Sequence, residues 1–303
     1  MPSGKQRAYY EHVTNSGEPM EILTCLSAKG GSAKTTIMVV LAAELTLRGY
    51  KVLTIDADTQ SSFSKMVGAY SDDEAYSHPQ RCYLGDLLLA SPARISTLLE
   101  EAVIETKFFG SVIAPGPNLK EQERQIASKS GSELRLVRSI EPLNGQYDFM
   151  LIDVGRQGTL TANAICAATG TLLAFETSLL GVEAIRQTLS EIEEIRSVYR
   201  TGPEIIAVVP TKYLRNRAVH NLALKTLREF PYSEYYSYQN EIKVVEPFEC
   251  RTAFEKMVAL GVPPHHMDDF KNQELYSNCE RLVNTILNWK EEKDATSGSL
   301  QTA

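Results

Sequence analysis

The chain has 303 residues, of which 43% are hydrophobic and 23% are charged, as is usual for a globular protein. Its 31 Lys and Arg residues and 38 Asp and Glu residues give a formal net charge of −7. That balance excludes a protein coated in positive charge, such as a histone-like DNA binder, but allows a local basic patch. No stretch approaches 18 consecutive apolar residues, so we expect no transmembrane helix.

The N-terminal residues are polar and lack the apolar run of a signal peptide. The five cysteines are odd in number, and no two of them have Cys-x-x-Cys spacing. A disulfide framework or a zinc site is therefore not expected, and a reducing cytoplasm is the predicted location.

Short apolar runs alternate with longer helical patterns through most of the chain. The apolar runs predict strands at residues 20–27, 51–55, 111–116, 149–153, 170–176, 204–210 and 242–245. The segments between and after them predict helices at residues 35–49, 84–106 with a break at Pro92, 119–142, 159–168, 182–200, 217–230, 251–260 and 273–290. This alternation predicts an α/β fold, in which helices cover both faces of a mostly parallel, twisted sheet. We expect one domain at 20–290, a polar arm at 1–19 and a disordered tail at 291–303.

A glycine-rich turn joins the first predicted strand to the first predicted helix. The turn consists of Lys29, Gly30, Gly31, Ser32, Ala33, Lys34, Thr35 and Thr36. Glycines let backbone N–H groups point inward around phosphate oxygens, and the helix N-terminus adds the positive end of its dipole. In this setting Lys34 would reach the β- and γ-phosphates, and the Thr35 hydroxyl would bind Mg²⁺. The alternative is a glycine-rich turn with a surface lysine, but the Lys-Thr-Thr ending favours a phosphate loop.

Acidic residues end two of the predicted strands. Asp56 and Asp58 follow the run at 51–55 and point to the same side, because side chains alternate along a strand. Asp153 closes the run at 149–153, and an apolar strand ending in Asp is typical of the residue that holds magnesium through bound water. Ligands of open α/β sheets bind at this edge, so we expect these carboxylates to face the phosphate loop.

The loop departs from the ordinary phosphate loop in two ways. Ala33 stands where glycine is usual before the lysine, and an additional lysine, Lys29, opens the loop. In this the sequence resembles the deviant Walker A P-loop ATPases, and within them the ParA group of partitioning proteins in the ParA/MinD superfamily. The resemblance implies that two chains enclose two ATP molecules and that Lys29 reaches the nucleotide of the other subunit. It also implies that Ala33 is tolerated if its φ angle is negative.

The same resemblance assigns roles to the acidic residues. Residues 56–60 look like the family's Asp-x-Asp-Pro-Gln segment, with Thr59 in place of proline. On that basis Lys29, Lys34 and Asp58 form the catalytic set, in which Asp58 orients the attacking water. Thr35, Asp56 and Asp153 form the predicted magnesium site, and ATP and Mg²⁺ are the predicted cofactors.

The strongest departure from the family follows Asp153. The family usually has a Pro-Pro pair there, whereas this chain has Val154-Gly155-Arg156-Gln157-Gly158. Arg156 could stabilise charge in the transition state, bind a partner or face solvent, and we favour a partner or solvent.

A basic cluster follows the strand at 204–210. By resemblance to the family, Pro210 and Thr211 are candidate neighbours of the adenine base. The cluster consists of Lys212, Arg215, Arg217, Lys225 and Arg228, and family members bind DNA without sequence preference through this region. The alternative is a solvated helix face opposite an apolar face made by Val219, Leu222, Leu224, Leu227 and Phe230.

These features predict a cytoplasmic, nucleoid-associated ATPase of DNA partitioning. It would form a homodimer with ATP, bind nonspecific DNA and be stimulated by a ParB-like, centromere-binding partner. The first alternative is a positioning ATPase or a conjugation or secretion accessory ATPase that acts through protein or membrane partners. The second is a metabolic amidoligase, for which the chain has no evident substrate module.

Two subtypes of the family fit less well. The roughly twenty polar residues before the first strand are too few for a helix-turn-helix domain. The apolar stripe of Leu282, Val283, Ile286 and Trp289 predicts a helix docked on the core, and its mixed charges argue against a membrane anchor.

Overall fold

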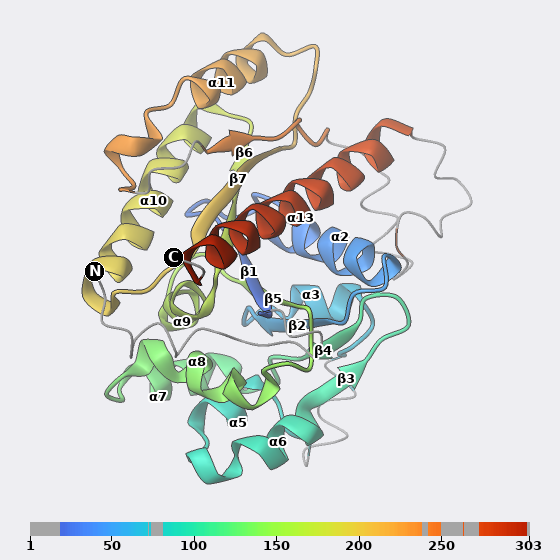
Figure 1. Cartoon of the computed structure of the whole chain (residues 1–303), viewed down its shortest axis with the longest axis vertical. Helices are drawn as coiled ribbons and strands as arrows, with labels where there is room; N and C mark the ends of the chain where they lie inside the picture. Colours follow the sequence, from blue (N-terminus) through green and yellow to red (C-terminus); the bar gives the residue numbers. More distant parts are fainter. Residues whose placement is uncertain are drawn as a thin grey trace.

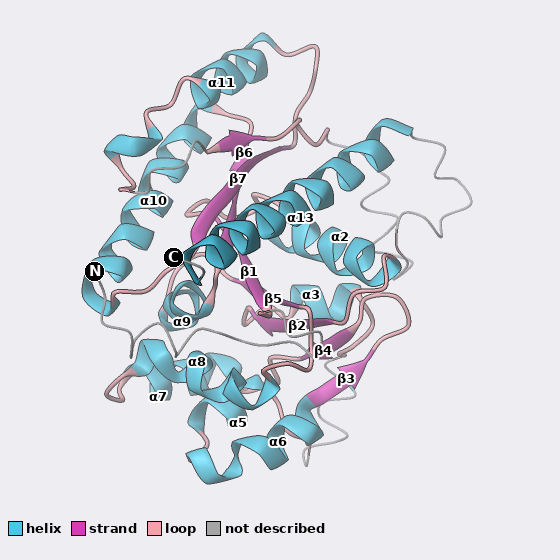
Figure 2. Ribbon diagram, viewed as in Figure 1, coloured by secondary structure: helices cyan, strands magenta, loops and turns pink. Residues whose placement is uncertain are grey.

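A computed structural model describes residues 19–71, 73, 81–237, 242–249, 263 and 273–301. Its centre is a sheet of eight strands in the order β3-β4-β2-β5-β1-β6-β7-β8 (Figures 1 and 2). The strands are β1 (Glu21–Leu26), β2 (Val52–Ala57), β3 (Val103–Glu105), β4 (Ser111–Ile113), β5 (Phe149–Val154), β6 (Gly170–Glu176), β7 (Glu204–Thr211) and β8 (Lys243–Val244). Neighbouring strands run parallel except β3 and β4, which pair antiparallel at one edge.

Helices cover both faces of the sheet, so the predicted fold class is confirmed. One face carries α2 (Lys34–Leu47), α3 (Ser62–Met66) and α13 (Gln273–Gln301). The other carries α5 (Leu84–Leu89), α6 (Ile95–Ala102), α7 (Leu119–Ala127), α8 (Arg135–Ile140), α9 (Thr159–Ala167), α10 (Leu179–Tyr199) and α11 (Ala218–Arg228). Figure 1 shows α13 beside α2, and α11 at the far end of the molecule near β7.

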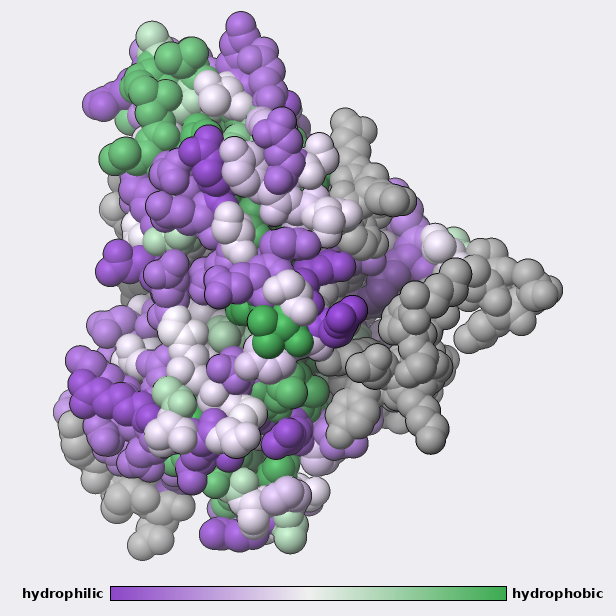
Figure 3. Space-filling view, turned by 90° about the vertical axis from the view of Figure 1, so that its left-hand side faces the viewer, coloured by the Kyte–Doolittle hydropathy of each residue, from purple (hydrophilic) through white to green (hydrophobic). Residues whose placement is uncertain are grey.

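Each central strand contributes to both cores. In β5 the side chains of Met150 and Ile152 pack with α5–α10, whereas those of Phe149 and Leu151 pack against α2 and α13. A strand that is buried on both faces consists of consecutive apolar residues, so the central strands could be predicted from the sequence. The molecular surface is mixed, and Figure 3 shows apolar groups among mainly hydrophilic ones, with an apolar patch near the top of that face.

Two predicted helices are interrupted. Residues 84–106 form α5, a short 3₁₀ turn at Pro92–Arg94, α6 and then the edge strand β3. Residues 119–142 split into α7, a 3₁₀ turn at Ser132–Leu134, α8 and another 3₁₀ turn at Glu141–Leu143. Gly131, with a left-handed φ of 67°, precedes the 3₁₀ turn that follows α7, and Pro142 cannot continue α8 because it lacks an N–H donor.

The predicted disordered tail at 291–303 is wrong as far as Gln301, because α13 extends from Gln273 to that residue. The extension is held by Lys293, whose ammonium group donates to both carboxylate oxygens of the buried Glu21, at 2.8 and 2.7 Å. The same ammonium group lies 4.9 Å from the centre of the Trp289 ring. A buried carboxylate requires a cation, and this contact fixes the end of the chain against β1.

Some predictions lie outside the described residues, namely the helix at 251–260 and nearly all of the arm at 1–19. The strand predicted at 242–245 is reduced to the two residues of β8. In the part of the chain that the structure describes, no helix combines the length and apolar character needed to cross a bilayer.

Candidate nucleotide-binding site

The glycine-rich loop lies between β1 and α2, at the carboxyl edge of the sheet. Gly31 and Ala33 both have left-handed backbones, with φ of 73° and 67°, and α2 begins at Lys34. The condition under which Ala33 was expected to be tolerated, a negative φ, is therefore not met. Two left-handed residues turn the chain sharply from the strand into the helix, and the loop can then surround an anion with its amides. Lys34 is 8% exposed at the base of this loop.

Buried carboxylates lie beside the loop. Asp56 and Asp153 are aligned residues on the neighbouring parallel strands β2 and β5, and both are 0% exposed. The carboxylate of Asp56 accepts hydrogen bonds from the backbone N–H groups of Asp58, at 3.1 Å, and Ser64, at 2.9 Å. Asp56 therefore holds the turn after β2 in place, which is an additional role to the predicted magnesium one.

Burial and electrostatic repulsion perturb this pair. Burial raises the pKa of Asp56 to about 6, and the amide hydrogen bonds from Ser64 and Asp58 oppose that shift. Burial also raises the pKa of Asp153 well above its usual range, and the Asp56 carboxylate raises it further. The nearby Thr35 side chain and Lys34 act in the opposite direction. Both carboxyl groups of such a buried pair are ionised together only when a nearby cation compensates their negative charge.

The donor set fits a magnesium ion. Both carboxylate oxygens of Asp153 are buried without a close hydrogen bond among the described residues, and the Thr35 side chain is the donor that lowers the pKa of this carboxyl. The described residues contain no group of three His, Cys, Asp or Glu side chains that could hold a metal ion. Magnesium suits this arrangement, because it usually keeps several waters and takes only one or two carboxylates together with phosphate oxygens. Asp153 and Thr35 are the residues that would hold it.

A cavity of about 730 Å³ opens over the loop. Its wall includes Gly30, Gly31, Ser32, Ala33, Lys34, Thr35 and Thr36, the acids Asp58 and Glu123, the residues Val154, Gly155, Arg156 and Gln157, and Lys212. The half-buried Asp58 accepts a hydrogen bond from the N–H of Gln60 at 3.0 Å. A methyl group added to Gly155 would lie 3.6 Å from Oδ1 of Asp58, so this carboxylate faces the segment after β5.

Glu176, at the end of β6, holds two lysines above the loop. Its carboxylate lies 3.0 Å from Nζ of Lys29 and 3.6 Å from Nζ of Lys212, and Lys29 also donates to the Ser178 hydroxyl at 3.3 Å. Lys212 is therefore brought to the phosphate loop, where a methyl group on Gly31 would lie 3.6 Å from its Nζ. The sequence grouped Lys212 with the basic cluster, and nothing local in the sequence indicated the Glu176 contacts.

The two candidate neighbours of the base lie behind the loop. The Thr211 hydroxyl, buried at the end of β7, donates to the carbonyl of Ser32 at 3.1 Å. Pro210 accepts from the N–H of Phe248 through its carbonyl at 2.8 Å. Among the described residues neither belongs to the wall of the cavity, so their predicted contact with a base stays a prediction.

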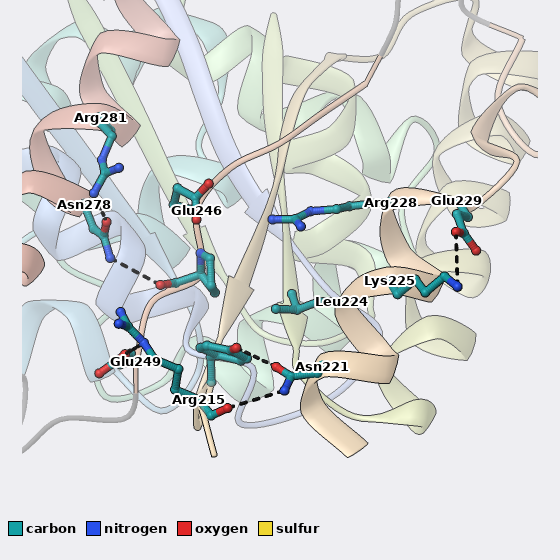
Figure 4. Close-up of a pocket in the computed structure, with 12 residues that line it drawn as sticks. Arg215, Asn221, Leu224, Lys225, Arg228, Glu229, Glu246, Glu249, Asn278 and Arg281 are labelled. Atoms are coloured by element: carbon teal, nitrogen blue, oxygen red, sulfur yellow. Dashed lines mark hydrogen bonds and ion pairs between the residues drawn. The ribbon is translucent and has the colours of Figure 1, made fainter. Parts of the chain in front are cut away.

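Three further members of the basic cluster line a second cavity of about 620 Å³ between α11 and α13 (Figure 4), namely Arg215, Lys225 and Arg228. Arg215 pairs with Glu249 at 3.0 Å, and Lys225 pairs with Glu229 at 3.9 Å. In Figure 4 the Arg228 side chain extends from α11 into this cavity. Arg281 of α13, which sequence reasoning missed because it is far from the cluster in the chain, also belongs to the wall.

The predicted helix face is only partly present. Arg217 precedes α11 as its N-cap, and the side chains of Arg217 and Arg228 are exposed. On the opposite face Leu224, Leu227 and Phe230 are buried as expected. Val219 and Leu222 are not buried, with 46% and 53% exposure, because α11 lies at the end of the molecule and only its inner side meets α10.

Comparisons with known proteins show which family the chain belongs to. The profile of the AAA domain family matches residues 20–205. The chromosome partitioning protein ParA of Caulobacter vibrioides is 28% identical over 217 residues, which cover 70% of this chain and 77% of that protein. The maintenance of carboxysome distribution protein A of Synechococcus elongatus is 28% identical over 198 residues, covering 63% of this chain and 72% of that protein.

Among solved structures, a complex of a Cyanothece McdA variant with ATP is similar with a TM-score of 0.72. It is 19% identical and the match covers 88% of this chain and 96% of that one. Likeness at this identity shows the fold alone. In this chain that fold is the eight-stranded sheet with the glycine-rich loop after its central strand β1.

Proposed function

Since this chain belongs to the AAA domain family and is of the ParA type, we propose that it hydrolyses ATP with magnesium and acts in partitioning. One observation carries the proposal. Lys34 and Thr35 line one cavity, and both side chains lower the pKa of the buried Asp153 carboxyl, which lies beside them. That combination suits a phosphate chain with a divalent cation.

The residues of this cavity would divide the work of hydrolysis. The loop amides and Lys34 bind phosphate oxygens, and Asp153 and Thr35 hold the magnesium ion. When bound, magnesium neutralises charge on the phosphates. Asp58 accepts a hydrogen bond from a water molecule and orients its oxygen toward the γ-phosphorus. The water oxygen forms a bond to that phosphorus while the bond from the phosphorus to the bridging oxygen breaks. ADP leaves with the electron pair of the broken bond, and a water proton passes to a phosphate oxygen of the inorganic phosphate that is released.

Two variants test the ATPase assignment. Asp58→Ala should leave ATP binding intact but stop turnover, because the carboxylate faces the cavity without supporting the loop. Lys34→Gln should abolish nucleotide binding, since the buried cation at the base of the loop is removed. The measurements are nucleotide binding by calorimetry and phosphate release. Hydrolysis by Asp58→Ala at the native rate would remove Asp58 from the mechanism.

Self-association through the loop face is the second part of the proposal. Lys29 is 28% exposed beside Glu176, and its contact with Ser178 places it at the start of α10. The first two residues of α10, Leu179 and Leu180, are 54% and 74% exposed. Exposed leucines beside a functional lysine support burial against a second copy of the chain. Lys29→Ala should therefore weaken ATP-dependent dimerisation, measured by analytical ultracentrifugation.

Nonspecific DNA binding is the third part, with nucleoid association in the cytoplasm as its consequence. Arg217 and Arg228 are exposed and, among the described residues, form no ion pair, and Arg281 lies across the second cavity from Arg228. Three arginines at one end of the molecule support contact with phosphates of the DNA backbone. A ParB-like, centromere-binding protein is the proposed partner that stimulates hydrolysis and releases the DNA.

Binding to random-sequence DNA at several salt concentrations tests this part. We expect the chain to bind the DNA only with ATP, with an affinity that falls steeply as salt is added. Arg228→Ala should reduce the slope of log affinity against log salt concentration by about one for each phosphate that the arginine neutralises. Arg124→Ala is the matched control, because Arg124 is exposed on α7 and paired with Glu121. Absence of retention at low salt would exclude the DNA role and leave the ATPase intact.

A positioning ATPase with a protein cargo is the second candidate, favoured by the likeness to the carboxysome distribution protein. It shares the ATP site and dimer but requires no steep dependence on salt in cargo binding. Capture of a cargo protein by the ATP-bound chain would support it.

A further inference from the structure

The segment of residues 154–158, at the end of β5 and after it, is held by contacts with two helices and faces the carboxylate of Asp58. Gly155 faces Asp58, as described above. The Gln157 side chain hydrogen-bonds to Glu191 of α10, whose pKa is raised by burial. A carboxylate oxygen of Glu123, on α7, accepts from the N–H of Leu160 at 3.3 Å. These contacts hold the backbone of the segment at the edge of the nucleotide cavity, so the side chain between them has a defined place.

Glu123 supplies a cap that α9 lacks. The N-cap of α9 is Gly158, which has no side chain to accept from the first N–H groups of the helix. Gly158 has φ of 136°, and a methyl group on it would lie 2.7 Å from Oε1 of Glu123. Glycine at this position therefore lets a carboxylate from another helix approach, and the segment is fixed close to the place where α9 begins.

Arg156 extends from this segment over the phosphate loop. A methyl group added to Gly30 would lie 3.0 Å from Cδ, 3.2 Å from Nε and 3.4 Å from Cζ of Arg156. The side chain thus packs on the bare backbone of Gly30, and both residues belong to the wall of the nucleotide cavity. The sequence favoured a partner or solvent for Arg156, but the fold brings it to the loop.

The charge on Arg156 has no counterpart in the protein. Among the residues that the structure describes, no carboxylate forms an ion pair with it, and its side chain is exposed. Lys29 and Lys212, by contrast, share the carboxylate of Glu176. An arginine fixed at the mouth of a phosphate loop without a carboxylate partner is suited to an anion, because a guanidinium group can donate two parallel hydrogen bonds to phosphate oxygens.

We infer that Arg156 donates hydrogen bonds to the γ-phosphate of ATP bound in the same chain, and so distinguishes ATP from ADP. The γ-phosphate is the part of the ligand nearest the hydrolysis machinery, and Gly155, next to Arg156, faces Asp58. Lys34 is at the end of the phosphate loop where α2 begins, whereas Gly30, on which Arg156 packs, is next to Lys29 at the start of the loop. Arg156 and Lys34 would therefore approach the bound phosphates from different parts of the loop. This inference rests on the proposed ATP site.

Calorimetry with a non-hydrolysable ATP analogue and with ADP, both in magnesium, tests the inference on the full chain. Arg156→Ala should weaken binding of the analogue at least about tenfold, as for loss of hydrogen bonds to a charged group, and change ADP binding less than about twofold. Arg156→Lys keeps the charge but loses the planar fork, so its loss should be intermediate. Arg124→Ala, which changes an exposed arginine outside the cavity, should match the wild type.

The same titrations in a Lys29→Ala chain separate a contact within one chain from a contact across a dimer, because Lys29 is the proposed trans residue. In the Lys29→Ala chain, Arg156→Ala should still weaken binding of the ATP analogue more than binding of ADP. If Arg156→Ala weakens the binding of the ATP analogue and of ADP equally, the inference is overturned and Arg156 has only a packing role. Unchanged affinity for the analogue would also overturn it. If the wild type binds neither ligand, the proposed ATP site itself fails.

Discussion

Ala33 stores backbone strain in the phosphate loop, and its replacement by glycine should release that strain. Ala33 has φ of 67° and ψ of 24°, a left-handed conformation that costs an L-residue about 1–2 kcal/mol. Glycine avoids this cost because it has no Cβ, but it gives the unfolded chain additional freedom worth about 0.4–1 kcal/mol. Ala33→Gly should therefore stabilise the nucleotide-free chain by a net value of about 0.5–1 kcal/mol.

Thermal unfolding measures this effect, and a domain of this size should gain about 1–2 °C in Tm. The matched control is Ala42→Gly, the same change in the middle of α2 at a residue that is 0% exposed. It should lower Tm, because glycine costs about 1 kcal/mol inside a helix and the buried methyl group is also lost. If both variants lower Tm, then Ala33 is not strained and the reasoning is refuted.

Three further predictions concern buried or capping charges. The raised pKa values of Asp56 and Asp153 mean that the folded state binds protons more tightly than the unfolded chain, so without ligand their contribution to stability grows as pH falls from 7 through about 6 toward 4. Asp153→Asn should raise Tm at pH 7 and flatten this dependence. Lys293→Met should lower the free energy of unfolding by about 2 kcal/mol, because the carboxylate of Glu21 is then buried without its cation. We expect a smaller loss than for a fully buried pair, since the Lys293 side chain is 27% exposed. Glu123→Ala should cost about 1 kcal/mol through loss of the α9 cap; chemical denaturation measures both losses.

Exposed pairs provide the controls for the last two variants. Lys225→Met breaks a pair in which both side chains are about two-thirds exposed, and Glu121→Ala breaks a similar pair on α7. Each should change stability by less than about 1 kcal/mol. Losses as large in these controls as in the test variants would contradict the roles of burial and capping. An unchanged pH dependence in Asp153→Asn would contradict the repulsion between the buried carboxylates.

The central strands could be predicted because they are buried on both faces, and the edge of the sheet could not. Val103, Ile104 and Glu105 follow α6 directly, without glycine or proline to separate helix from strand. They become β3 because a turn held by Thr106 and Gly110 returns the chain against β4. Pairing with another segment decides their structure, and a local pattern does not contain that information.

The site divides in the same way. The loop and the acidic residues at the ends of β2 and β5 lie in short contiguous motifs, so the sequence identifies them. The fold brings the loop and Asp58 to one cavity, and Asp56 and Asp153 are buried beside it. Glu176 and Glu123 contact the site from segments with no motif of their own, and only the folded chain reveals them. The sequence grouped Lys212 with the basic cluster because five basic residues lie within 17 positions. In the fold β7 ends at the loop, and Lys212, with a left-handed backbone at φ of 54°, contacts Glu176.

The distribution of charge gives a physical reason for the proposed dependence of DNA binding on ATP. Three of the five predicted basic residues are paired with glutamates, and the whole chain carries a net charge of −7. A single chain then offers few cations to DNA, chiefly Arg217, Arg228 and Arg281. The free energy gained from counterion release grows with the number of phosphates neutralised, so the affinity rises exponentially with that number. If ATP joins two chains, the number of phosphates within reach doubles, and a dimer can bind where a monomer does not.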